Sequence, residues 1–425
     1  MFDPVEATIE QVYRAYWPTL VASLARWTGD LDRAEDAAAE AIASACRSWP
    51  VEGIPREPGA WLQTSARRRV LDRIRRDHVA EAKLGQLAMD LGDAPAADAV
   101  SDPDDPFGAV RWSDEAAQDL LRLVFTCCHP ALAPSAQVPL ALRLLCGLTA
   151  AETARLLLTT EPTVAQRIVR AKRKIRDAGI VLAVPARAQW PDRLGSVLTV
   201  VALVFTEGHA ATQGPDLVRS ALCDEALRLA ALLRRLLPDE AEVLGLSALL
   251  LLTDARRDAR VADGDLVLLA DQDRRLWRWR DIGRGLELAE TAVRRAGGQP
   301  GPYVLQASIA ALRVQPDHDR QAVVLLFDRL HTITPSPAVG VNRAAAVAAA
   351  RGPAAGIAAL ACLDAAPGDH RGHLLRAELL HELGEHAAAT GHLEQAVAAA
   401  RNDVEARHLR RRLDTWRGRS IPDQG

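Results

Sequence analysis

The segment 149–176 carries side chains suited to contacting DNA. Thr149 and Glu152 form a Thr-x-x-Glu capping box, which predicts the start of a short helix. Residues 159–161 interrupt that helix, and Pro162 fits the first turn of a second one. Because hydroxyl, amide and guanidinium groups read base edges and hold phosphates, we expect a helix-turn-helix whose second helix enters the major groove. At roughly 100° per residue, the DNA-facing side of this second helix holds Thr163, Gln166, Arg167, Arg170 and Lys174.

The opposite side of the second helix is apolar and could pack inward. A surface helix with ordinary solvated charges would look similar, and the turn lacks the glycine that is frequent in this motif. The local charge favours DNA, because residues 137–176 hold eight Lys and Arg against two Glu, a net charge of +6. The formal net charge of the whole chain, -3, conceals this asymmetry. The residues that share the apolar side are Val164, Ile168, Ala171 and Ile175.

A second basic helix is predicted over residues 60–76. Residues 61–77 contain six Arg against two Asp, a net charge of +4. Residues 81–119, which follow it, contain ten acidic residues against two basic ones, a net charge of -8. Two cationic helices separated by an acidic, Pro-rich linker suggest two DNA contacts set apart along a duplex. Much of an apolar stripe for this helix comes from Trp61, Leu62, Ser65, Val70 and Ile74.

The composition predicts an all-α protein, since alanine is abundant, aromatic residues make up 4% and strand-type runs are nearly absent. One helix is expected over 31–49, ending before Pro50. Near the C-terminus, Gly352 and Gly384 occupy corresponding places in two similar segments, which suggests tetratricopeptide-like helix pairs with a period of about 34 residues. We predict helical domains over 1–80 and 114–183, an acidic linker over 81–113, and a helical, tetratricopeptide-like extension over 184–425.

These motifs, in this order, resemble the extracytoplasmic-function (ECF) sigma factors of bacterial RNA polymerase. The run Ala34-Glu-Asp-Ala-Ala-Ala-Glu-Ala-Ile42 resembles the polymerase-binding helix of that family, with Ala39 where the family has Gln. Residues 61–76 are similar to its promoter-opening helix, with Arg68 in place of Asn. Residues 163–175 match its pattern T-V-x-x-R-x-x-R-A-x-x-x-L/I. The tail also resembles that of a large ECF group with a long helical extension.

The resemblance implies a fold of two small sigma domains, the first opening the minus-ten element and the second reading the minus-thirty-five element of a promoter. It implies RNA polymerase core and promoter DNA as partners, and an extension that regulates the sigma domains and offers a place for an unknown ligand or protein. Acidic residues repel phosphate and so suit the polymerase; these are Glu35, Asp36 and Glu40. The DNA-binding residues so implied are Trp61, Arg67, Arg68, Arg69, Arg75, Arg76, Thr163, Gln166, Arg167, Arg170 and Lys174.

Enzyme, cofactor and metal motifs are lacking. No Gly-rich phosphate loop occurs. His381 and His386 resemble a zinc-protease pair with one residue too many, and on one continuous helix they would lie on different faces. The six cysteines have no metal or disulfide spacing, which predicts small buried residues in a reducing cytoplasm. We therefore expect no catalysis, no cofactor and no metal.

Several polar residues of the extension leave alternatives open. His209 is expected at a helix end, and residues 263–265 as a turn. Salt bridges or a small-molecule pocket could be formed by Arg256, Arg257, Asp271 and Asp273.

The sequence predicts a cytoplasmic protein, because no secretory signal and no apolar run of about 20 residues is present. Two other functions stay open. One is a helix-turn-helix regulator on a helical repeat scaffold that does not bind polymerase, and the other is an enzyme within residues 192–425.

Overall fold

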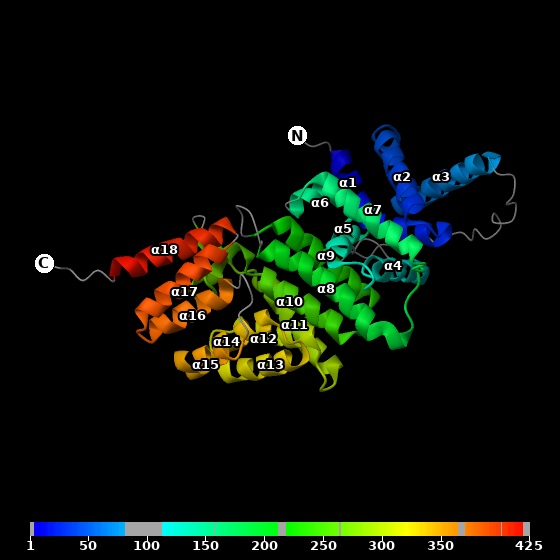
Figure 1. The fold of residues 1–425 in the computed structure, drawn as a ribbon. Coiled ribbons are helices and arrows are strands. Elements are labelled where there is room, and N and C mark those ends of the chain that lie inside the picture. The colour runs from blue at the N-terminus through cyan, green and yellow to red at the C-terminus, as the bar shows by residue number, and fades with distance from the viewer. Residues whose placement is uncertain are drawn as a thin grey trace. The chain divides into compact units, whose positions relative to one another are not determined.

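The computed structural model describes residues 4–80, 113–157, 159–210, 218–262, 265–363, 370–400 and 402–419 (Figure 1). The chain divides into two compact units, Met1–Leu203 and Val204–Gly425. The predicted all-α class is confirmed: among the described residues, the one sheet is the antiparallel pair β1 (Val261–Ala262) and β2 (Asp265–Leu266). The predicted acidic linker lies almost wholly outside the described residues, and the domain boundaries predicted from the sequence stay predictions.

Helices α1, α2 and α3 pack together in the first unit, and α1 also contacts α4 and α5. Helices α5, α6 and α7 pack against one another. The residues that bury most completely in this unit include Trp17, Leu62, Phe125 and Leu140. The helices of this unit are α1 (Pro4–Thr28), α2 (Leu31–Glu52), α3 (Pro58–Ala80), α4 (Asp114–Cys127), α5 (Pro134–Leu145), α6 (Ala150–Leu156), α7 (Glu161–Asp177), the 3₁₀ turn η1 (Arg187–Gln189) and the start of α8 (Trp190–His209).

Helix α2 begins and ends at residues that satisfy its free backbone groups. The Asp30 carboxylate accepts hydrogen bonds from the amides of Asp32 (2.7 Å) and Arg33 (3.1 Å). The expected end before Pro50 is wrong, since the helix runs to Glu52 with Pro50 in its last turn. Gly53, at φ 87°, closes that turn by donating its N–H to Trp49 O at 3.0 Å. The helix therefore continues for two residues beyond Pro50, although proline has no backbone N–H to donate.

The second unit consists of helices joined by short turns, with α10 packed on α9, α11 and α12. Gly352 separates α14 from α15 at φ 93°, and Gly384 separates α16 from α17 at φ 83°. The predicted correspondence of these two glycines is therefore confirmed, since each allows a left-handed turn between paired helices. The helices are α9 (Ser220–Leu236), α10 (Ala241–Asp254), α11 (Trp279–Ala296), α12 (Pro302–Arg313), α13 (Arg320–Ile333), α14 (Pro337–Arg351), α15 (Pro353–Ala361), α16 (His370–Glu382), α17 (His386–Ala399) and α18 (Asp403–Arg419), with 3₁₀ turns η2 (Arg257–Ala259), η3 (Leu269–Asp271) and η4 (Arg274–Leu276).

Candidate functional sites

Helices α6 and α7 form the predicted pair, and both start as expected. The Thr149 hydroxyl accepts from the Glu152 amide (3.1 Å), and the Glu152 carboxylate accepts from the Thr149 amide (2.7 Å), so the capping box is complete. Thr160 caps α7 by accepting from the Thr163 amide at 3.4 Å, and Pro162 lies in the first turn. These caps fix where α7 begins and therefore which of its side chains face outward.

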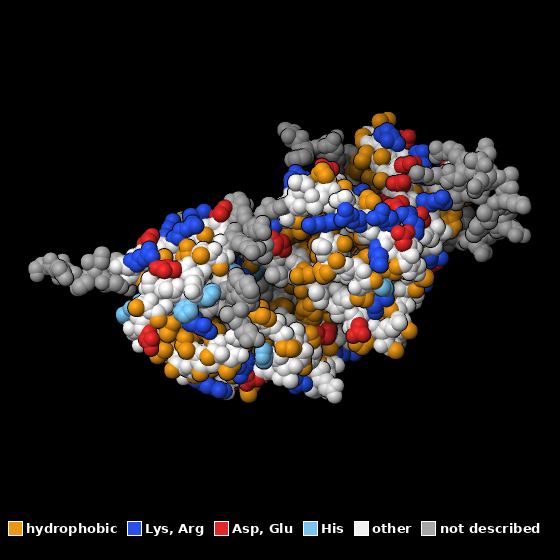
Figure 2. Space-filling model, in the orientation of Figure 1, with side chains coloured by type: hydrophobic (Ala, Val, Ile, Leu, Met, Phe, Trp, Pro, Cys, Tyr) orange, Lys and Arg blue, Asp and Glu red, His pale blue; other side chains and the backbone are white. Residues whose placement is uncertain are grey.

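The two faces of α7 separate as the sequence predicts. Val164, Ile168, Ala171 and Ile175 are all buried. In the space-filling view, Lys and Arg side chains form a band along the position of α7 (Figure 2). Arg173 and Arg176 of α7 are also exposed, and Arg176 lies 3.5 Å from Asp32. Of the predicted DNA-binding residues, Gln166, Arg170 and Lys174 are exposed, and Thr163 and Arg167 are partly exposed.

Helix α3 presents the second predicted basic surface. Arg68 is exposed, while Arg67 and Arg69 are partly exposed. Arg69 donates to the Ser44 hydroxyl at 3.0 Å, and its Nε lies 3.9 Å from Glu40 Oε2. The predicted residues Arg75 and Arg76 fall within α3, but their side chains lie outside the described residues.

A cleft of about 1080 Å³ lies beside α3. Trp61 lines it and packs edge-on against Trp49, with ring centroids 5.4 Å apart and planes at 67°. The half-buried Trp61 therefore serves the packing of the unit and also borders an open space. Arg68 and Arg69 line the same cleft, together with the hydroxyls of Ser44, Ser48, Thr64 and Ser65.

The three acidic residues predicted to bind polymerase differ in environment. Asp36 and Glu40 are exposed on α2, whereas Glu35 is only 8% exposed. The Glu35 carboxylate accepts hydrogen bonds from Arg143 of α5 and from Lys172 of α7, the latter at 2.5 Å. Glu35 is therefore paired with cations from the helix-turn-helix region, and its predicted contact with polymerase stays a prediction.

These contacts belong to a larger junction between α1–α2 and α5–α7, which we call the latch and define by Tyr13, Asp32, Glu35, Arg143 and Lys172. Lys172 Nζ also lies 2.8 Å from Asp32 Oδ1, and its side chain is 9% exposed. Burial alone would lower the pKa of Lys172, but the charges and hydrogen bonds of Glu35 and Asp32 raise it above its usual value. Tyr13 Oη donates to Gly147 O, which adds a neutral contact to the same junction.

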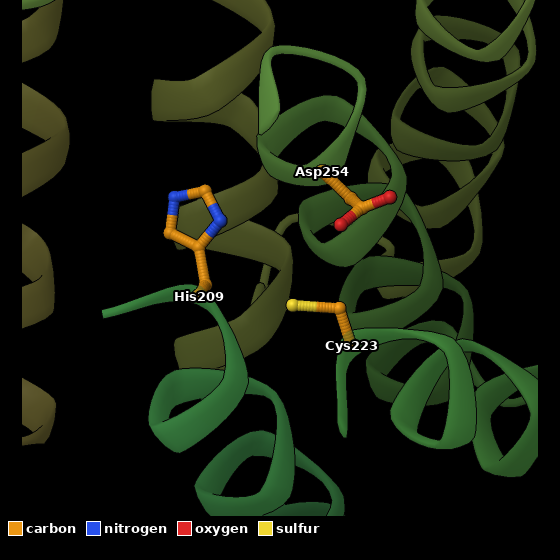
Figure 3. A group of neighbouring side chains, drawn as sticks. All are labelled: His209, Cys223 and Asp254. Atoms are coloured by element: carbon orange, nitrogen blue, oxygen red, sulfur yellow. The ribbon is translucent and has the colours of Figure 1, made fainter. Parts of the chain in front are cut away.

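The second unit brings together His209, Cys223 and Asp254, from the ends or starts of α8, α9 and α10 (Figure 3). Their side chains point toward one another, and their ligand atoms lie within 4.8 Å of each other. His209 is at the end of α8, as predicted, and it stacks on Phe205 at 5.4 Å. Sequence reasoning missed this group, because its members lie on three different helices and have no motif spacing.

The electrostatics of this group oppose a cation. Arg257 donates to both carboxylate oxygens of Asp254 (2.8 and 2.7 Å), and Arg278 also pairs with that carboxylate. Burial raises the pKa of Cys223 to about 12, with the charge of Asp254 adding to it. Burial and the charges of Arg260, Arg256 and Arg257 lower the pKa of His209 to about 2. A metal would have to displace guanidinium groups and deprotonate the thiol, so we interpret the group as a buried polar network.

Two other expectations need correction. His381 and His386 do not lie on one helix, since α16 ends at Glu382 and α17 begins at His386. The turn brings their Nδ1 atoms to 3.2 Å, so the expectation of divergent faces is wrong. The cysteines are also not all buried, because Cys46 and Cys362 are exposed.

For the polar residues of the extension, the sequence left salt bridges and a ligand pocket as alternatives. Arg257 forms salt bridges with Asp254 and Asp224. Asp273 instead binds its neighbour Arg275 at 2.7 Å. None of the described helices combines the length and apolar character that crossing a membrane requires.

Comparison with known proteins places family models on three segments. Residues 12–78 match Sigma-70 region 2, residues 122–175 match Sigma-70 region 4, and residues 193–293 match a family of unknown function, DUF6596. An uncharacterized protein of Rhizobium meliloti (strain 1021) is 40% identical over 404 residues, which cover 93% of each chain. No solved structure matches.

Proposed function

The chain belongs to the sigma-70 family, with the architecture of an ECF sigma factor extended by a DUF6596 region, and on this premise we propose which surface performs each step of promoter recognition. Sigma-70 regions 2 and 4 imply that it recognises promoters together with RNA polymerase core and performs no covalent chemistry of its own. It would work in the cytoplasm, where bacterial polymerase is found.

The outward side of α7 reads the minus-thirty-five element. Its buried side anchors the helix through four apolar residues, while amide, hydroxyl and guanidinium groups remain accessible on the other side. This separation is the observation that carries the proposal, because a recognition helix needs a fixed register and free polar side chains. Gln166, Arg167 and Arg170 read base edges, and Lys174 holds phosphate.

The basic surface of α3 and the cleft beside it hold the melted minus-ten strand. A flipped base needs an aromatic or apolar wall and polar groups for its edge, and the cleft offers Trp61 together with several hydroxyls. Arg67 and Arg68 are placed along the helix to hold phosphates of the displaced strand. Arg75 and Arg76 continue this basic run in the sequence.

Helix α2 contacts RNA polymerase through Asp36, Glu40 and, after the latch opens, Glu35. The carboxylate of Glu35 is occupied by Arg143 and Lys172 in the closed arrangement. Polymerase therefore competes with the helix-turn-helix region for the same side chain. This competition makes latch opening a step in holoenzyme assembly.

The experiment that tests the function is run-off transcription with added core polymerase. The full chain should direct transcripts from selected promoters that core alone does not produce. An Arg170→Ala variant should lose transcript, whereas Arg294→Gln, an exposed change on α11 that breaks a pair with Glu290, should not. DNA binding without any polymerase-dependent transcript would favour the alternative of a helix-turn-helix regulator that does not bind polymerase.

The extension regulates the sigma regions. Its tetratricopeptide-like helix pairs would offer an extended surface for a partner. A fragment that tests this must keep the whole of α8, because Trp190 packs on Phe125 at 5.9 Å and Arg193 donates to Phe125 O at 2.9 Å. A fragment of residues 1–210 should differ from the full chain in transcript yield. Equal yield and equal promoter affinity would make the extension a separate module.

A further inference from the structure

We propose that the second unit contains a binding site for a small anion, built from the guanidinium groups of Arg256 and Arg274 at the Trp277 ring together with that of neighbouring Arg313. The ligand class is a small molecule that bears a phosphate or carboxylate group. The site lies in the extension and is independent of the roles assigned above to the sigma regions.

Three elements bring these side chains together. Arg256 follows the end of α10, Arg274 opens η4, and Arg313 ends α12. The guanidinium carbons of Arg274 and Arg256 lie 4.5 and 5.8 Å from the centroid of the Trp277 ring. Arg274 donates to Val314 O at 2.6 Å, which places it beside the chain at Arg313. Trp277 is 5% exposed and forms part of a core with Leu252 and Ile282.

The cluster lacks compensating negative charge among the described residues. Arg256 donates its Nε to Leu252 O at 3.2 Å, and Arg274 also bonds a backbone carbonyl. Arg313 lies over the Phe327 ring at 5.3 Å. Two acids close to these arginines in the sequence pair with other cations, since Asp254 binds Arg257 and Arg278, and Asp273 binds Arg275. Each of the three cations therefore meets only neutral partners.

Like charges in a half-buried setting are costly unless a counter-ion joins them. Burial lowers the pKa of Arg256, and the charge of Arg313 lowers it further. Burial lowers the pKa of Arg313 as well. The charged form of neighbouring Arg260 is also destabilised. Burial and the charges of Arg256 and Arg371 lower the pKa of Arg260 to about 10, although Glu405 acts in the opposite direction. A bound anion would remove these penalties at once.

Guanidinium groups suit phosphate and carboxylate because their planar forks pair with two oxygens. Among the described residues, Arg256 donates through Nε to a backbone carbonyl and Arg313 lies over an aromatic ring, so neither guanidinium is paired with a carboxylate there. The buried indole N–H of Trp277 also has no acceptor there. The cluster is thus rich in donors and poor in acceptors, which selects an anion over a cation or a neutral sugar.

Inorganic phosphate is the probe for the test, with the full-length protein titrated calorimetrically against sodium phosphate and against sodium chloride at matched ionic strength. We expect phosphate-specific heat and a higher unfolding temperature. Arg256→Gln and Arg313→Gln should each weaken phosphate binding about tenfold, the value of one charge-assisted contact. Arg294→Gln on α11 is the matched control and should leave binding unchanged.

A second readout separates a ligand site from a structural role. Without phosphate, Arg256→Gln should raise the unfolding temperature because it relieves repulsion, whereas loss of a structural contact would lower it. An Arg313→Lys variant keeps the charge but loses the fork, and it should also bind phosphate less well. The proposal is overturned if phosphate acts no differently from chloride on the wild type, or if all variants respond to phosphate equally.

Discussion

Removing Lys172 should strengthen the binding of core polymerase, contrary to the usual effect of deleting a side chain from an interface. Lys172 holds Glu35 at 2.5 Å and Asp32 at 2.8 Å, and its side chain is 9% exposed. Taking one partner from a buried ion pair costs about 3–5 kcal/mol when the other is left alone. Here Glu35 keeps Arg143, and Asp32 keeps Arg176 at 3.5 Å. The cost to the closed arrangement should therefore be smaller, about 1–3 kcal/mol.

In the open arrangement the latch contacts are broken and Glu35 is accessible. If polymerase binds only this arrangement, destabilising the closed one raises the affinity for polymerase by the same free energy. Each 1.4 kcal/mol is a factor of about ten in the ratio of open to closed chains. The apparent dissociation constant for core polymerase should thus fall by about five- to 150-fold in Lys172→Ala, as long as the closed arrangement dominates in the wild type. Titration of labelled full-length protein with core polymerase, without DNA, measures this effect.

Arg173→Ala is the matched control, because it removes the next cation of α7 from an exposed position outside the latch. It should leave the affinity for core polymerase unchanged. Equal affinities for the wild type and Lys172→Ala would refute the competition between polymerase and latch. Weaker binding by Lys172→Ala alone would mean that Lys172 itself serves the polymerase contact.

Three further predictions concern other surfaces. Arg170→Ala should weaken promoter binding by about 1–3 kcal/mol if it reads a base, or lower the salt slope by about one unit if it holds a phosphate, and anisotropy at several salt concentrations distinguishes the two. Arg68→Ala should slow promoter opening more than it weakens duplex binding, and wild-type permanganate reactivity of melted thymines would contradict this. Because of His209, the free energy of unfolding should fall as the pH drops below about 6.5, by at most about 1.4 kcal/mol per pH unit. In that range the unfolded chain binds a proton at His209, whereas the folded chain does not, since the pKa of the buried ring is lowered to about 2. Denaturation at several pH values should show a flatter slope for His209→Gln than for the wild type, and equal slopes would contradict this.

Local patterns explain what could be predicted from the sequence. The capping box at Thr149 and the apolar face of α7 depend on residues a few positions apart, so the sequence contains the whole interaction. The predicted end of α2 before Pro50 was wrong because a proline near a helix end is compatible with more than one boundary. The helix ends instead at Glu52, where Gly53 caps it. The relative position of His381 and His386 was predicted wrongly because the prediction assumed one continuous helix, whereas a turn at Gly384 separates α16 from α17.

The ion pairs of Glu35 lie beyond local patterns. Its partners Arg143 and Lys172 are 108 and 137 positions away, and no spacing rule connects them. The same holds for the arginines around Trp277, which come from three elements of the second unit. Such clusters depend on tertiary packing, and the sequence shows only that each residue is basic.

The geometry of α7 also orders the events of promoter recognition. Lys172 and the base-reading residues share one helix but face different ways, since Gln166 and Arg170 are exposed while the Lys172 side chain is buried against α2. The closed latch therefore leaves the minus-thirty-five-reading side accessible and occupies the side chain that polymerase needs. We infer that the latch restrains holoenzyme assembly more than duplex recognition. Lys172→Ala should then change the affinity for core polymerase by a much larger factor than the affinity for isolated minus-thirty-five duplex, and equal changes in both would show that opening the latch exposes the DNA-reading side as well.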